Sequence, residues 1–255
     1  ANIAALRWGR AWIDDTEAVE VAAAARPGAV PTVEVDPLPP ALAHRVHRLD
    51  LGVELTSTMT MLAADLTAYQ HPEYAARFLD RVEQVQRQDP RLTETVARSL
   101  HKLMAYKDEY EIARLLLADD SRSAAERVGG RGATITWRLH PPMLKAIGRD
   151  SKIGVSEKVG RPLMIGLAKA KRLRGTRLDP FGRTEMRRTE RALIDEYHAQ
   201  IDAELAFLGK SPGEIENVLD ALALPMQIRG YEDLKLHRVG EYRAAVAARR
   251  AAIDP

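Results

Sequence analysis

Cysteine is absent from this sequence of 255 residues, and aromatic residues make up only 5% of it. Without thiolates the chain has no disulfide, no cysteine nucleophile, no thiolate-bound zinc and no cysteine-ligated iron–sulfur cluster. The scarcity of aromatic side chains disfavours a stacking surface for single-stranded nucleic acid. For a chain of this composition we expect a reducing, cytoplasmic location.

Long apolar runs are also missing. A membrane-spanning helix needs roughly 20 apolar residues, whereas the best run here, Leu163 to Leu167, is soon followed by Lys169. The first residues carry no secretory signal pattern, and the chain starts with Ala rather than Met. We therefore expect no membrane partner. We also expect this sequence to be a piece of a longer protein, with its first residue inside a helix.

The residues that are present fit a folded protein. Hydrophobic residues make up 45% of the chain and charged residues 29%, which excludes a disordered or fibrous chain. The 38 Lys and Arg residues nearly balance the 36 Asp and Glu residues, for a net charge of +2. The total charge therefore indicates no polyanionic partner.

Proline marks the predicted domain boundary. Five of the 14 prolines fall between Pro27 and Pro40, where they remove backbone donors and prevent regular structure. We predict a linker over residues 27–40. It separates a helical tail of a preceding domain, residues 1–26, from a helical C-terminal domain, residues 41–255.

Hydrophobic periodicity predicts a mainly α fold for that domain. The strongest pattern runs from Leu92 to about Ala118 and predicts one continuous helix. A capping box at residues 211–214 predicts another helix start. Further helices are predicted at residues 41–70, from Pro72 onward, and at 163–174, 184–208 and 231–253.

One β element interrupts the helical pattern. Apolar and polar residues alternate over Thr134–His140, and Ile153–Val159 is the expected partner strand. The predicted architecture is a multi-helix domain with one small β-hairpin-like insertion around residues 134–159.

Candidate catalytic motifs fail on their spacing. Gly209-Lys210-Ser211 lacks the earlier glycine of a phosphate-binding loop, because Glu204 holds that position. The glycines at 130 and 132 lack the third glycine of a dinucleotide fingerprint and precede a strand. No serine lies in a Gly-x-Ser-x-Gly elbow. We assign no catalytic and no cofactor-binding residue to this chain.

Two histidines raise the question of a metal site. His44 and His47 are three residues apart, and Asp50 and Glu54 follow on the same predicted helical side. Arginines flank both histidines, and an ordinary solvated face explains the stretch better. We assign no metal ligand.

A basic patch is the one candidate binding surface. Between Lys158 and Arg191, eleven Lys and Arg residues occur with three acids, for a local net charge of +8. A solvated helical face is one interpretation, and contact with an anionic partner is the other. The candidate contacts are Lys169, Lys171, Arg172 and Arg174.

Several segments form a recognisable series along the chain. They are Leu66–Gln70 with Tyr74–Arg77, Leu92–Leu117, Leu173–Thr176 with Asp179–Gly182, Glu190–Ile194 with Glu196-Tyr197, and Leu224-Pro225 with Gln227–Gly230. In this order they resemble the C-terminal region of the fused indolepyruvate ferredoxin oxidoreductases, a 2-oxoacid:ferredoxin oxidoreductase family. The opening Arg7–Arg10 is similar to the end of the preceding γ-type domain.

The resemblance implies a parent enzyme that oxidatively decarboxylates an aryl 2-oxoacid and forms an acyl-CoA. Such a parent uses thiamine diphosphate with Mg²⁺, and passes electrons through [4Fe–4S] clusters to ferredoxin. This chain has neither cysteine nor a Gly-Asp-Gly motif, so the resemblance places these cofactors in other domains. It also implies a homo-oligomeric parent whose other domains or subunits are partners of this chain.

We therefore expect a noncatalytic domain that serves packing and assembly. A second hypothesis is that the basic patch docks ferredoxin or the phosphates of CoA. The alternative is a free-standing helical binding module for a protein or nucleic acid.

Overall fold

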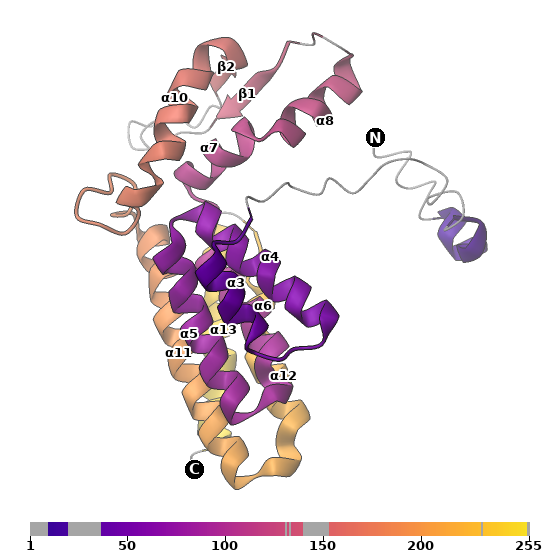
Figure 1. Cartoon of the computed structure of the whole chain (residues 1–255), viewed down its shortest axis with the longest axis vertical. Coiled ribbons are helices and arrows are strands. Elements are labelled where there is room, and N and C mark those ends of the chain that lie inside the picture. The colour runs from indigo at the N-terminus through magenta and orange to yellow at the C-terminus, as the bar shows by residue number, and fades with distance from the viewer. Residues whose placement is uncertain are drawn as a thin grey trace. The chain divides into compact units, whose positions relative to one another are not determined.

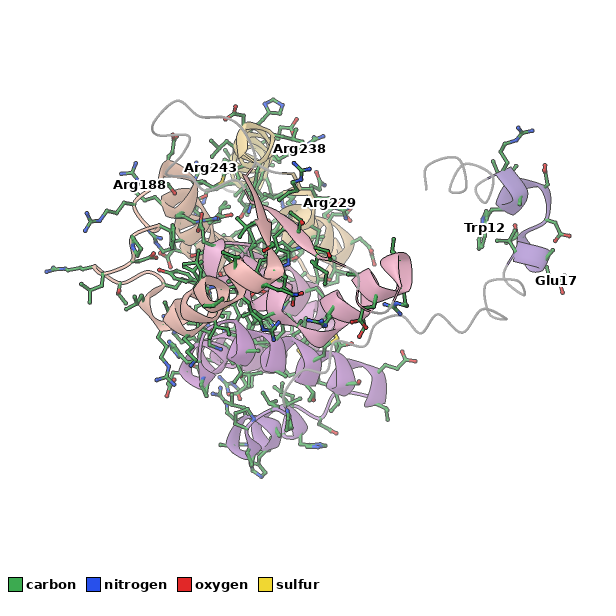
Figure 2. The ribbon with its side chains drawn as sticks, turned by 90° about the horizontal axis from the view of Figure 1, so that it is seen from above. Trp12, Glu17, Arg188, Arg229, Arg238 and Arg243 are labelled. Carbon is green, nitrogen blue, oxygen red and sulfur yellow. The ribbon has the colours of Figure 1, made fainter. Side chains whose placement is uncertain are left out.

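The computed structural model describes residues 10–19, 37–130, 132, 134–139, 153–230 and 232–253. The chain divides into two units, Ala1–Glu34 and Val35–Pro255, and this division lies within the predicted linker. In the first unit, residues 10–14 and 16–19 are helical. Asp15 separates them and accepts a hydrogen bond from the Ala18 amide at 2.9 Å, as an N-cap does. Trp12 and Glu17 mark this unit in Figure 2.

The second unit is mainly α, as predicted (Figure 1). Its α-helices are α3 (Pro40–His47), α4 (Val53–Tyr69), α5 (Pro72–Gln88), α6 (Thr93–Met104), α7 (Glu109–Leu117), α8 (Asp119–Gly129), α10 (Glu157–Lys169), α11 (Glu185–Lys210), α12 (Ile215–Ala223) and α13 (Glu232–Ile253). Short 3₁₀ helices are η1 (Pro90–Leu92), η2 (Ala170–Leu173), η3 (Pro212–Glu214) and η4 (Leu224–Gln227). Within the described ranges, no helix is both long enough and apolar enough to cross a membrane.

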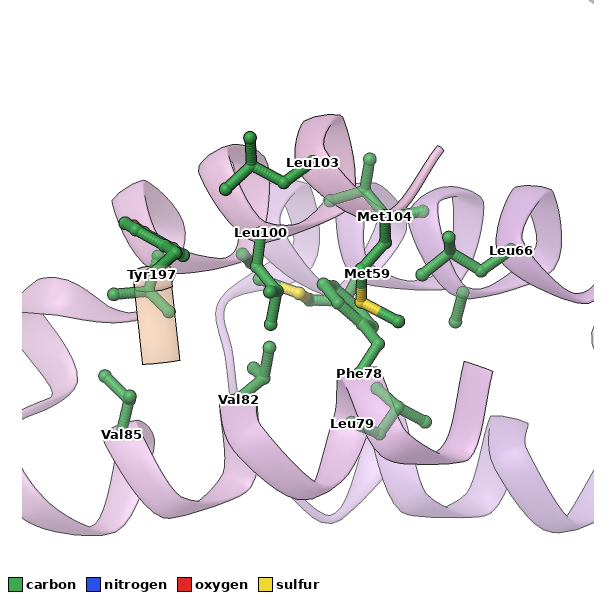
Figure 3. Packing of buried hydrophobic residues seen from close by; sticks show 14 of the residues in the cluster. Met59, Leu66, Phe78, Leu79, Val82, Val85, Leu100, Leu103, Met104 and Tyr197 are labelled. Carbon is green, nitrogen blue, oxygen red and sulfur yellow. The ribbon is translucent and has the colours of Figure 1, made fainter. Parts of the chain in front are cut away.

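The main hydrophobic core lies between α4, α5, α6 and α11. Met59, Phe78, Leu100 and Tyr197 come from these four helices and are fully buried. Figure 3 shows Phe78 and Met59 close together, with Leu100 to one side of them. The apolar periodicity of each helix places such residues on one face, and removing that face from water drives the packing.

The prediction of one continuous helix over residues 92–118 is wrong, because the structure has two helices there. The structure ends α6 at Met104 and begins α7 at Glu109. The Asp108 side chain accepts a hydrogen bond from the Glu111 amide at 2.8 Å and caps α7. An Asp followed three residues later by Glu is a helix-start pattern, and here this cap outweighs a continuous periodicity.

The capping box predicted at residues 211–214 is also wrong, because its side-chain hydrogen bond does not form. The side chain of Ser211 makes no cap contact, and Glu214 instead accepts a hydrogen bond from Asn217. The predicted restart is correct, because η3 and then α12 follow. Proline at the first position of η3 accounts for this restart, since its ring presets the helical φ.

The β insertion is confirmed, but its second strand is shorter than predicted, because residues 157–159 belong to α10. Strands β1 (Thr136–Leu139) and β2 (Ile153–Ser156) pair antiparallel, with Trp137 opposite Val155. Trp137 packs with Ala113 of α7 and Met164 of α10 in a second, smaller core. Helices α7 and α10 also pack on each other. Residues 140–152, between the strands, lie outside the described residues.

Candidate functional site

The predicted basic patch separates into an exposed part and an inward-facing part. Lys169 and Arg172 are exposed. Lys171 instead donates a hydrogen bond to the Ala68 carbonyl oxygen of α4. Arg174 is only 5% exposed, so its prediction as a contact for an external partner is wrong. Sequence counting missed this because it cannot show which charges face inward.

Arg174 is the centre of a buried polar network. Its guanidinium donates to both carboxylate oxygens of Asp108, at 2.5 and 2.7 Å, and to the Tyr69 carbonyl oxygen at 2.6 Å. It also lies 3.6 Å from the centroid of the Tyr69 ring, a favourable cation–π distance. Burial is the largest single effect and opposes the charge on Arg174, but the hydrogen bonds that Arg174 donates to Asp108 and the electrostatic attraction of Tyr69, Asp108 and Tyr106 together outweigh it and raise the pKa of the guanidinium.

Asp179 holds the loop that follows Arg174. One carboxylate oxygen accepts hydrogen bonds from the Tyr110 hydroxyl at 3.0 Å and the Phe181 amide at 3.1 Å. The other accepts from the Gly175 amide at 2.9 Å. A Cβ atom at Gly182 would lie 2.5 Å from this second oxygen, so only glycine fits there. The loop over residues 175–184 is therefore folded around one buried carboxylate.

An arginine-lined pocket of about 540 Å³ lies against this loop. Arg177 and Arg183 come from the loop, and Arg188 and Arg191 from the first turns of α11. Figure 2 labels Arg188, which is exposed. We call these four residues the arginine cluster.

The cluster has no carboxylate partner within the described part of the chain, although Arg187 beside it has two. Arg191 donates to the Gly182 carbonyl oxygen at 2.6 Å through one nitrogen. Its other terminal nitrogen, Nη1, is buried and has no hydrogen-bond partner among the described residues. The Arg238 and Arg243 side chains, also labelled in Figure 2, pair with Glu241 and Glu196.

Part of the local charge of +8 counted in the sequence is therefore neutralised in the structure. Arg161, Arg174 and Arg187 pair with carboxylates, and all of these except Glu190 lie outside residues 158–191. The unpaired charge that gathers around one pocket belongs to the arginine cluster, which sequence reasoning did not select. Asp179-Pro-Phe-Gly182, a turn between Arg177 and Arg183, is the signal that could have indicated it.

The possible histidine site does not form. His44 and His47 are exposed on α3, which ends at His47, so Asp50 and Glu54 are not on the same helix face. Asp50 adopts a φ of 50° in the turn before α4. Nowhere in the described ranges do three or more potential ligand side chains gather around a metal position.

The side chains of the arginine cluster are suited to holding an anion. The planar guanidinium of arginine can donate two parallel hydrogen bonds to an oxyanion such as phosphate or carboxylate. The described cluster offers donors and positive charge, and the nearest acid, Asp179, already accepts three hydrogen bonds. No described pair of cluster residues has the opposed acid and base characters that proton transfer requires.

Comparisons with known proteins give one match. Residues 55–248 match a family of unknown function, DUF6537. The match runs from α4 into α13 and includes both the Arg174 network and the arginine cluster. No curated protein and no solved structure matches the chain. Because the family match covers most of the sequence, this chain belongs to the DUF6537 family.

Proposed function

We propose that this chain is a noncatalytic C-terminal domain of a cytoplasmic indolepyruvate-type 2-oxoacid:ferredoxin oxidoreductase. Its role is to pack against the thiamine diphosphate and iron–sulfur domains and to order their assembly. The resemblance of the segments supplies the enzyme class. The observation that carries the packing role is the Arg174 network, because segments that bear the resemblance meet in it.

Three segments that are distant in sequence contribute four residues to this network. Tyr69 comes from α4, Asp108 from the start of α7, and Arg174 and Asp179 from the loop before α11. Every one of these groups is occupied by an internal partner. A group that performs acid–base chemistry must face a substrate, so this arrangement supports a structural role for the shared segments.

The second candidate function is a free-standing helical module that binds an anionic protein or nucleic acid. The unpaired arginine cluster favours it. If the first proposal holds, the arginine cluster binds ferredoxin or the phosphates of CoA.

The natural polypeptide that contains this chain tests the first proposal. We expect it to carry iron–sulfur absorbance and thiamine diphosphate, and to reduce ferredoxin with indolepyruvate. A colourless polypeptide without these properties contradicts the proposal and favours the binding module.

A substitution pair in that polypeptide tests the packing role. Arg174→Leu removes the centre of the network, and we expect loss of the native oligomer in sedimentation velocity together with loss of ferredoxin reduction. Arg172→Leu is the matched control, because it removes the same charge from an exposed position two residues away. A polypeptide that keeps its oligomeric state and turnover after deletion of residues 41–255 overturns this role.

A further inference from the structure

The arginine cluster concentrates positive charge in a small volume. Four arginines are among the residues that line a pocket of about 540 Å³, within the usual range of roughly 300–1,000 Å³ for small-molecule sites. No described residue forms an ion pair with any of them. Like charges held this close repel one another, and an anion in the pocket removes that repulsion.

Arg191 is positioned for such an anion. Its bond to the Gly182 carbonyl oxygen fixes the guanidinium, and Nη1 is left buried without a partner among the described residues. Buried polar atoms normally have a hydrogen-bond partner, and an exception needs an explanation. Arg191 also lines the pocket, so an oxyanion bound there lies beside this guanidinium.

The acid in the pocket does not oppose anion binding strongly. Both oxygens of Asp179 accept hydrogen bonds from the Tyr110 hydroxyl and from two backbone amides, which disperse its charge. The four arginines and this one carboxylate leave a formal charge of +3 at the pocket. A ligand with more than one negative charge matches this excess.

We propose that the pocket binds a small phosphorylated molecule, with Arg191 as the fixed contact and Arg183 and Arg188 as adjustable ones. A phosphoryl group carries about −1.5 to −2 charges at pH 7 and three strong acceptor oxygens. The volume exceeds that of a single phosphate, so the ligand has a second phosphoryl group or an attached organic part. This inference deepens the docking part of the proposed function and rests on it for its biological meaning, but binding is measured on this chain alone.

Calorimetric titration of the 255-residue chain tests the proposal with two probes, inorganic pyrophosphate and adenosine 3′,5′-bisphosphate. We expect one molecule to bind per chain, with affinity that falls as salt increases. The double variant Arg183→Ala/Arg188→Ala should weaken binding by about tenfold or more, because two charge-assisted contacts are lost. Both side chains are exposed, and the one hydrogen bond that they make within the described residues is a long one of 3.4 Å from Arg183 to the Arg177 carbonyl oxygen, so the variant should fold, which circular dichroism checks.

Arg48→Ala/Arg87→Ala is the matched control. It removes the same two charges from exposed positions outside the pocket, and binding should change by less than about twofold. Tighter binding of the bisphosphate identifies a nucleotide-like ligand, and equal binding identifies the phosphoryl group alone. Absence of binding by both probes, or equal losses in the two double variants, overturns the proposal. Because these outcomes need no parent enzyme, they are independent of the assembly role.

Discussion

Single charged residues inside the fold carry much of its specificity. Arg174 and Asp108 are only 5% and 2% exposed. Removing such ions from water costs several kcal/mol each, and only good geometry with further hydrogen bonds offsets this cost. Asp108 meets both conditions, because it pairs with Arg174 and also accepts the hydrogen bond from the Glu111 amide.

Asp108→Ala should therefore be strongly destabilising. It leaves the guanidinium of Arg174 buried without its partner and removes the cap of α7. We expect the free energy of unfolding in urea to fall by about 3–5 kcal/mol. Glu94→Ala is the control, since Glu94 pairs with Arg98 on the exposed surface of α6 and should cost less than about 1 kcal/mol. Equal small effects in both variants would contradict a structural role for the buried pair.

Between elements, close approach depends on one glycine of α10. A Cβ atom at Gly160 would lie 2.9 Å from Val155 of β2 and 3.1 Å from the ring of Trp137 of β1. The Trp137 ring cannot move freely, because it is buried in the second core. Gly160 therefore allows the hairpin to pack directly on the helix.

Gly160→Ala should separate the hairpin from α10. We expect a loss of about 1–3 kcal/mol in the free energy of unfolding, with a change in Trp137 fluorescence. Gly166→Ala, in the same helix, has nothing within 4 Å of the new Cβ. It should be neutral or stabilising by up to about 1 kcal/mol, because alanine favours the helix. Loss of stability in the second variant but not in the first would refute this packing.

At the scale of the whole molecule, buried tyrosines join distant helices. The Tyr69 hydroxyl donates to the Tyr106 carbonyl oxygen at 3.0 Å, and that of Tyr197 to the Leu222 carbonyl oxygen at 2.8 Å. Burial disfavours the tyrosinate form and raises the pKa of the hydroxyl, to about 12 for Tyr106. The residues affected in this way are Tyr69, Tyr74, Tyr106, Tyr110, Tyr197 and Tyr242.

Alkaline unfolding should follow from these shifts. The tyrosine pKa is 10.0 without the fold and higher within it, so above pH 10 the folded state binds more protons than the unfolded state. Stability is then fully present below pH 10 and decreases as pH rises toward 12 and beyond. We expect tyrosinate absorbance and loss of helical circular dichroism to appear together. Tyrosinate absorbance that rises near pH 10 while the helices persist would contradict this coupling.

Periodicity and helix-start residues are local properties, and the sequence alone therefore determined most helices and the hairpin. Pro72 begins α5, Thr184 caps α11, and the alternation around Trp137 marks β1, because each signal acts within a few residues. The same local reasoning failed at Asp108, where a cap competed with a continuous apolar face. It also could not show where charged side chains point.

Tertiary structure alone decided which basic residues are free. Arg174 and Arg188 are indistinguishable in a count of charges, but one meets Asp108 in the interior and the other faces the pocket beside Arg191. An ion pair forms between groups that the fold brings within a few ångströms, whatever their separation along the chain. The arginine cluster thus arises from the fold of the 175–184 loop against α11, which no local pattern specifies.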